Sequence, residues 1–137
     1  MALIRILVVD DSPDWQRFLL ARLESNCDLK IIGVASDGLE AVQKAAELQP
    51  DLMLMDLNLP VMNGFDATRR IREVSPNSKV LFLTQNASRD LVSAAFEAGA
   101  CGYIVKSDFG VDLVPGIKAV FENKEFVSRS LRAGSQT

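Results

Sequence analysis

Five apolar runs of strand length recur along this chain, and four of them end in polar residues that fit a single site. These endings are Asp10 and Asp11, then Asp56, then Thr84, and finally Lys106. If the runs are parallel strands, their carboxyl ends lie side by side at the sheet edge where open α/β proteins bind ligands. Three carboxylates would then meet one hydroxyl and one ammonium. Such an acidic pocket needs a cation, and an anion could bind between that cation and the lysine.

Segments with helical periodicity separate the apolar runs. Ser12 followed by Pro13 is a typical helix start, Asp37 and Ser88 begin later helices, and Gly99 ends one. This β-α alternation occurs five times and predicts a doubly wound α/β domain, with a five-stranded parallel sheet covered by helices on both faces. The runs are continuously apolar rather than alternating, as expected for a sheet buried on both sides.

The composition narrows the class of protein. A chain of 137 residues is one domain by length, and its net charge of −3 argues against direct binding to nucleic acid. No apolar run is long enough for a membrane span and no signal-peptide pattern is present, so we expect a cytoplasmic protein. Cys27 and Cys101 have no metal-ligand spacing and are expected to be reduced thiols. The absence of histidine excludes histidine-based catalysis, metal ligation and phosphoacceptance.

The strand endings, together with residues 56–64 (DLNLPVMNG), resemble the receiver domain of bacterial two-component response regulators. The resemblance covers about residues 3 to 125 and implies a flavodoxin-like fold with strand order 2-1-3-4-5. We therefore expect a receiver domain at 1–125 and a polar tail at 126–137, which frays or starts a linker. Residues 106–108, 116–120 and 126–128 resemble receivers that precede a LuxR-type helix-turn-helix domain. The chain is then either a fragment of such a regulator or a stand-alone receiver.

The resemblance implies a Mg²⁺-dependent phosphoryl transfer to Asp56 from a histidine kinase, a phosphotransfer protein or acetyl phosphate. A carboxylate can form such a covalent intermediate. Asp11, Asp56 and the backbone carbonyl of Asn58 would bind Mg²⁺ directly, and Asp10 would act through metal-bound water. Oxygen ligands of this kind suit a hard cation.

The resemblance also implies a conformational switch. Lys106 and Thr84 would each bind a phosphoryl oxygen, and Tyr103 would turn inward when Thr84 moves towards the phosphoryl group. The domain would then be a regulatory phosphoacceptor rather than an enzyme, relaying the change to an output domain or partner in transcription regulation. A homodimer could form through helix four, strand five and helix five, or through helices one and five. In the simpler alternatives, Thr84 is only a β-branched strand residue and Tyr103 a half-buried aromatic on an edge strand.

The roles of several other residues, and some alternative classes of protein, stay open. Gln85 stands where the family usually has a small residue, and Ser107 stands where it often has a cis proline. A cis bond before a non-proline residue costs about 2.5–4 kcal/mol, which leaves the geometry of the Lys106–Ser107 peptide in question. Gly64 is expected to have a positive φ, and Trp15 is expected to pack locally. An aspartate-based phosphohydrolase, a receiver-like domain that is not phosphorylated and a flavin-binding domain are the alternative classes.

Overall fold

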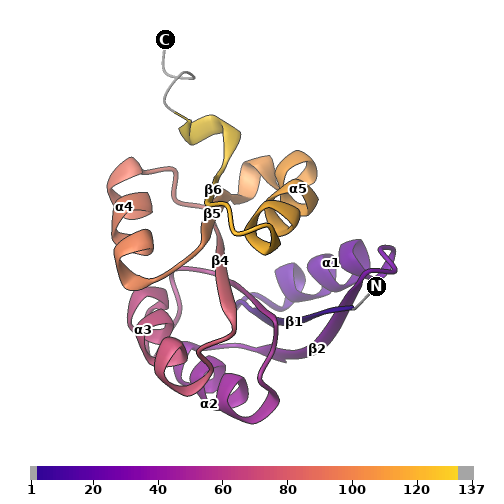
Figure 1. The fold of residues 1–137 in the computed structure, drawn as a ribbon, viewed down its shortest axis with the longest axis vertical. Coiled ribbons are helices and arrows are strands. Elements are labelled where there is room, and N and C mark those ends of the chain that lie inside the picture. The colour runs from indigo at the N-terminus through magenta and orange to yellow at the C-terminus, as the bar shows by residue number, and fades with distance from the viewer. Residues whose placement is uncertain (1–2, 133–137) are drawn as a thin grey trace.

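The computed structural model describes residues 3–132, which form a central parallel sheet between two layers of helices (Figure 1). The strand order is β2-β1-β3-β4-β5-β6. The strands are β1 (Ile4–Val9), β2 (Leu29–Ala35), β3 (Leu52–Met55), β4 (Lys79–Thr84), β5 (Gly102–Val105) and β6 (Phe126–Val127). The helices are α1 (Pro13–Glu24), α2 (Gly38–Leu48), α3 (Gly64–Val74), α4 (Arg89–Ala98) and α5 (Phe109–Phe121), with short 3₁₀ turns η1 (Lys106–Asp108) and η2 (Arg129–Leu131). The predicted doubly wound fold is confirmed.

Each face of the sheet packs a separate apolar core against its helices. Helices α1 and α5 cover one face, and α2, α3 and α4 cover the other (Figure 1). Leu19 of α1 and Ile117 of α5 are buried on the first face, and Ala41 of α2 and Ile71 of α3 are buried on the second. The middle strands are thus buried on both sides, which explains their continuous apolar sequences.

Polar side chains fix the start of four helices. Ser12, Asp37, Asn63 and Ser88 are N-caps whose side chains each accept a hydrogen bond from a backbone N–H in the first turn. Each cap of this kind contributes about 1 kcal/mol to stability. Helices α1, α2 and α4 start just beyond the carboxyl ends of β1, β2 and β4. Their caps therefore also set where the loops at this edge of the sheet turn.

The sheet has six strands rather than the five that we predicted. Phe126 and Val127 pair in parallel with Gly102 and Tyr103 of β5. An aromatic and a β-branched residue suit a strand, and β5 would otherwise leave an unpaired edge. The polar composition of the whole tail concealed these two residues. The fold thus continues beyond residue 125, whereas residues 133–137 lie outside the part that the structure describes.

The chain that follows β6 is held against α5 by two carboxylates. Asp108 accepts hydrogen bonds from the hydroxyl of Ser128, and from the backbone N–H and hydroxyl of Ser130 at 3.1 and 2.6 Å. Buried Asp112 accepts from the backbone N–H of Arg129 at 2.9 Å and forms an ion pair with its guanidinium at 3.2 Å. Burial raises the pKa of Asp108, but the hydrogen bonds from Ser128 and Ser130 and the nearby Arg129 outweigh it, so the net pKa is lowered.

Candidate functional site

The predicted site residues lie at the carboxyl edge of the sheet. Asp10 directly follows β1, Asp56 follows β3, and Lys106 follows β5. The backbone N–H of Asp10 donates to Ala35 at 3.0 Å, and that of Asp56 donates to Val9 at 2.9 Å. Because these bonds continue the pairing of the strands, the backbone of both aspartates is fixed by the sheet rather than by a free loop.

Lys106 joins the two buried aspartates. Its Nζ lies 2.8 Å from Oδ2 of Asp10 and 3.2 Å from Oδ2 of Asp56. The side chains of all three residues are at most 10% exposed. A charge in such surroundings is costly unless it is paired, so the ammonium and the two carboxylates stabilise one another.

Three carboxylates gather where a cation could bind. Oxygen atoms of Asp10, Asp11 and Asp56 all lie within 4.8 Å of one another, and Asp11 is exposed. They line a pocket of about 290 Å³ together with Ser12, Trp15, Asn58, Gln85 and Lys106. One ammonium cannot balance three carboxylates, so the pocket keeps an excess of negative charge. Its hard oxygen donors fit Mg²⁺ better than a soft metal.

The loop between β3 and α3 places Asn58 at this pocket. The backbone N–H of Asn58 donates to Oδ1 of Asp56 at 3.3 Å. The expected positive φ at Gly64 is wrong, because in this loop Val61 has the positive φ, at 70°. Gly64 is needed for close packing instead: a Cβ there would lie 2.8 Å from Cε1 of Phe82 and 2.9 Å from Cα of Leu57.

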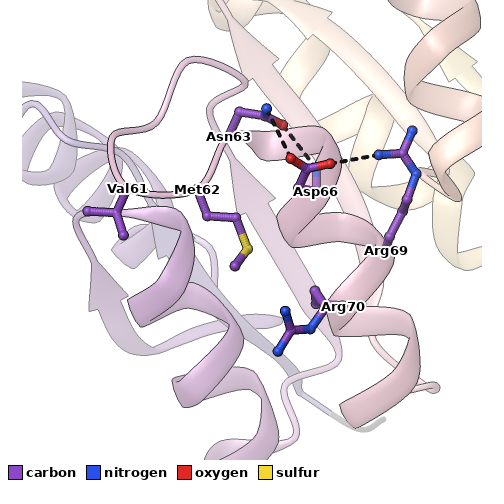
Figure 2. A pocket seen from close by; sticks show the side chains of 6 residues that line it. All are labelled: Val61, Met62, Asn63, Asp66, Arg69 and Arg70. Carbon is purple, nitrogen blue, oxygen red and sulfur yellow. Dashed lines mark hydrogen bonds and ion pairs between the residues drawn. The ribbon is translucent and has the colours of Figure 1, made fainter.

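A second hollow, of about 500 Å³, is lined by residues from the end of the same loop and from α3 (Figure 2). Its carboxylate, Asp66, accepts hydrogen bonds from the Asn63 side chain at 3.3 Å and from Arg69 at 2.9 Å. Its remaining lining residues are Val61, Met62 and Arg70. None of the predicted site residues lies in this hollow, so the strand-end pocket remains the candidate site.

Thr84 and Tyr103 meet at the backbone of Asn86. Thr84 is fully buried, and its hydroxyl accepts a hydrogen bond from the backbone N–H of Asn86 at 3.5 Å. The next residue, Gln85, lines the pocket at the end of β4. The Tyr103 hydroxyl donates to the carbonyl of Asn86 at 2.8 Å. Burial, aided by the charge of Asp56, raises the pKa of Tyr103 to about 12. Because Tyr103 is fully buried and β5 pairs with β6, it is not the half-buried edge aromatic of the simpler alternative.

Trp15 is the site residue that sequence reasoning missed. The expected local packing is present, since Trp15 packs edge-on against Phe18, but Nζ of Lys106 also lies 4.5 Å from the centroid of the Trp15 ring. Trp15 also packs edge-on against Phe109, which starts α5. Its position in the first turn of α1, just after the acidic pair, was the one available signal, but the sequence did not show that this turn faces Lys106.

The peptide bond between Lys106 and Ser107 is trans, since residues 3–132 contain no cis peptide bond. This resolves the question raised by the serine at that position. Lys106 instead begins the 3₁₀ turn η1, which leads directly into α5. The 3₁₀ turn into α5, rather than a cis proline, therefore sets the path of the chain after Lys106.

Comparisons with a family model and with known proteins point to the same family. Residues 6–114 match the model of the response regulator receiver domain. The chain is 38% identical over 117 residues to the transcriptional regulatory protein LiaR of Bacillus subtilis, covering 85% of this chain and 56% of LiaR. It is 37% identical over 102 residues to the chemotaxis protein CheY of Thermotoga maritima, covering 74% of this chain and 84% of CheY.

A solved structure agrees with these sequence relatives. A LuxR-family response regulator from Aurantimonas sp. SI85-9A1 superposes with a TM-score of 0.90 at 32% identity, covering 95% of this chain and 93% of that one. The chain spans about half the length of the transcriptional regulators that it matches. Among the helices of residues 3–132, none is long and apolar enough to cross a membrane.

Proposed function

The chain belongs to the family of response regulator receiver domains, and we propose that Asp56 is the residue through which it works as a phosphorylation-dependent switch. The observation that supports this proposal is the place of Asp56 between the acidic pair and Lys106. Oδ1 of Asp10 accepts from the N–H of Ser12 at 2.9 Å and Oδ2 from Lys106 at 2.8 Å. The oxygens of Asp56 have longer contacts, at 3.2 and 3.3 Å, so a lone pair is more easily released for attack.

The reaction would be an in-line displacement at phosphorus. A carboxylate oxygen of Asp56 forms a bond to phosphorus while the bond to the donor breaks, and the leaving group departs with the electron pair. From acetyl phosphate the leaving group is acetate; from a phosphohistidine it is imidazole, which takes up a proton from solvent. The ammonium of Lys106 can move from Asp56 to a phosphoryl oxygen and remain paired with Asp10.

The excess negative charge of the pocket supports a role for Mg²⁺. The carboxylates of Asp10, Asp11 and Asp56 and the backbone carbonyl of Asn58 are the oxygen ligands available to it. When bound, Mg²⁺ would offset the charge of the incoming phosphoryl group. Asp11, exposed at the pocket mouth, has the freest carboxylate for direct ligation, and Asp10 is held by Lys106 and Ser12.

The contacts of Asn86 support the switch role of Thr84 and Tyr103. A phosphoryl group on Asp56 would attract the Thr84 hydroxyl and break its weak bond to the N–H of Asn86. The same residue accepts the Tyr103 hydroxyl bond, so a shift of this backbone changes the position of Tyr103 as well. The surface of α4, β5 and α5 would then shift between two arrangements.

The relatives suggest what lies on either side of this switch. We propose that a histidine kinase or phosphotransfer protein supplies the phosphoryl group and that the output is transcription regulation, as the name of LiaR indicates for that relative. The domain would act as a regulator and not as an enzyme on another substrate. A homodimer through α4, β5 and α5, or through α1 and α5, is the proposed assembly.

Labelling with acetyl phosphate tests this function. In Mg²⁺, wild-type protein should gain the mass of one phosphoryl group, and the adduct should be lost in mild base. Asp56→Asn should remain unlabelled, because an amide is not a nucleophile, yet keep its fold. Asp66→Asn, which alters an exposed carboxylate of the second hollow, is the matched control and should label normally. Full labelling of Asp56→Asn would refute the proposal.

A further inference from the structure

We propose that Trp15 is a positioning residue that holds the ammonium of Lys106 over the phosphoryl pocket. This inference rests on the proposed function for its kinetic consequence, but the contact itself does not. Nζ of Lys106 lies 4.5 Å from the centroid of the Trp15 ring. A cation over an aromatic face is attracted by the negative charge of that face, and tryptophan gives the strongest attraction of the aromatic residues.

The Trp15 ring is held in place from two sides. It packs edge-on against Phe18 of the same helix at a centroid distance of 5.4 Å, and against Phe109 of α5 at 5.7 Å. Phe18 and Phe109 are themselves 4.9 Å apart. Phe109 lies only three residues after Lys106, at the start of α5. The three-ring cluster thus connects α1 to the turn that carries the lysine.

The ring matters because Lys106 must change partners when the phosphoryl group arrives. In the resting site, its ammonium is shared between Asp10 and Asp56. To bind a phosphoryl oxygen, it must leave Asp56 without moving out into water. Trp15 is half-buried and lines the same pocket, so its face can hold the ammonium through this exchange. Without the ring, Lys106 would be better hydrated and less well placed.

Simple packing is the competing explanation. If Trp15 only fills space between α1 and α5, then loss of Phe18, its neighbour in the cluster, should impair the site in a similar way. If the contact with Lys106 is what matters, loss of the Trp15 ring should impair the site more than loss of the Phe18 ring. Phe18 is 49% exposed and is the matched control for loss of one aromatic ring.

The kinetic test compares Trp15→Leu, Trp15→Phe and Phe18→Leu with wild type in acetyl phosphate and Mg²⁺. The labelling rate should fall about fivefold in Trp15→Leu and only about twofold in Trp15→Phe, because phenylalanine keeps a weaker aromatic face. Phe18→Leu keeps the Trp15 ring over Lys106 and an apolar side chain beside that ring, so it should lose clearly less of the labelling rate than Trp15→Leu. Equal loss in Trp15→Leu and Phe18→Leu, or no loss in either, would overturn the proposal. Trp15→Phe keeps the test decisive if Trp15→Leu does not fold.

Fluorescence provides a readout that packing alone would not change. Trp15 is the single tryptophan of the chain, so the tryptophan emission comes from this ring alone. A nearby ammonium quenches indole emission by donating a proton. Lys106→Met should therefore brighten the protein without any phosphodonor, and Lys124→Met, which removes an exposed ammonium, should not. Unchanged emission in Lys106→Met would refute the contact. If wild type takes no phosphoryl group, the proposed function fails, and this emission result alone decides the role of Trp15.

Discussion

Replacement of Lys106 by methionine removes the one ammonium that pairs with both buried aspartates. Asp10 and Asp56 are 2% and 8% exposed, so water cannot fully replace that partner. Removing one partner of a buried ion pair costs about 3–5 kcal/mol. We therefore expect Lys106→Met to lose about 3 kcal/mol of unfolding free energy in EDTA.

Urea and thermal unfolding measure this loss. For 137 residues, an unfolding entropy of about 2.1 cal/mol/K per residue converts 3 kcal/mol into a Tm decrease of about 10 °C. Mg²⁺ should restore much of the lost stability, because a cation bound among the same carboxylates takes over the role of the ammonium. The matched control is Lys124→Met, whose pair with Glu122 is exposed and should cost less than about 1 kcal/mol. A Lys106→Met protein as stable in EDTA as the control would refute this account of the site.

Three further predictions concern the metal, the switch and the C-terminal segment. Millimolar Mg²⁺ should raise the Tm of wild type, and Asp11→Ala should lose most of this increase; equal increases would exclude Asp11 as a ligand. Beryllofluoride with Mg²⁺ should alter amide exchange between residues 87 and 109 and leave α1 little changed, and identical exchange would contradict the switch. Because the Asp108 pKa is lowered, its contribution to stability is present above the ordinary value of 3.8 and is lost as pH falls below it, so amide exchange at residues 128–131, expressed relative to the intrinsic exchange rate at each pH, should accelerate there in wild type. In Asp108→Ala it should be fast already at neutral pH; equal protection in the two proteins would show that Asp108 does not hold this segment.

The strand-end residues could be predicted because their positions follow from chain order. A residue that directly follows a parallel strand lies at the carboxyl edge of the sheet, whatever the details of packing. Asp10, Asp56 and Lys106 therefore meet in the structure as expected. The helix starts at Ser12 and Ser88 could also be predicted from the sequence, because a capping side chain acts within one turn of its own position.

The residues that escaped prediction depend on packing between distant segments. The contact of Trp15 with Lys106 requires the angle at which α1 meets the start of α5, which a sequence pattern does not contain. The two-residue strand β6 is too short to show periodicity. The prediction of a positive φ at Gly64 was wrong because an Asn-Gly pair usually signals a turn with positive φ. Here the close approach of Phe82 requires the glycine instead.

The most direct test of the central claim is to locate the phosphoryl group chemically. Borohydride reduces an aspartyl phosphate to homoserine, so peptide mapping after labelling with acetyl phosphate and reduction identifies the modified residue. We predict homoserine at position 56 and unmodified aspartate at positions 10 and 11. Homoserine at position 10 or 11, or no reducible adduct in a protein that has bound Mg²⁺, would contradict the assignment of Asp56 as the phosphoacceptor.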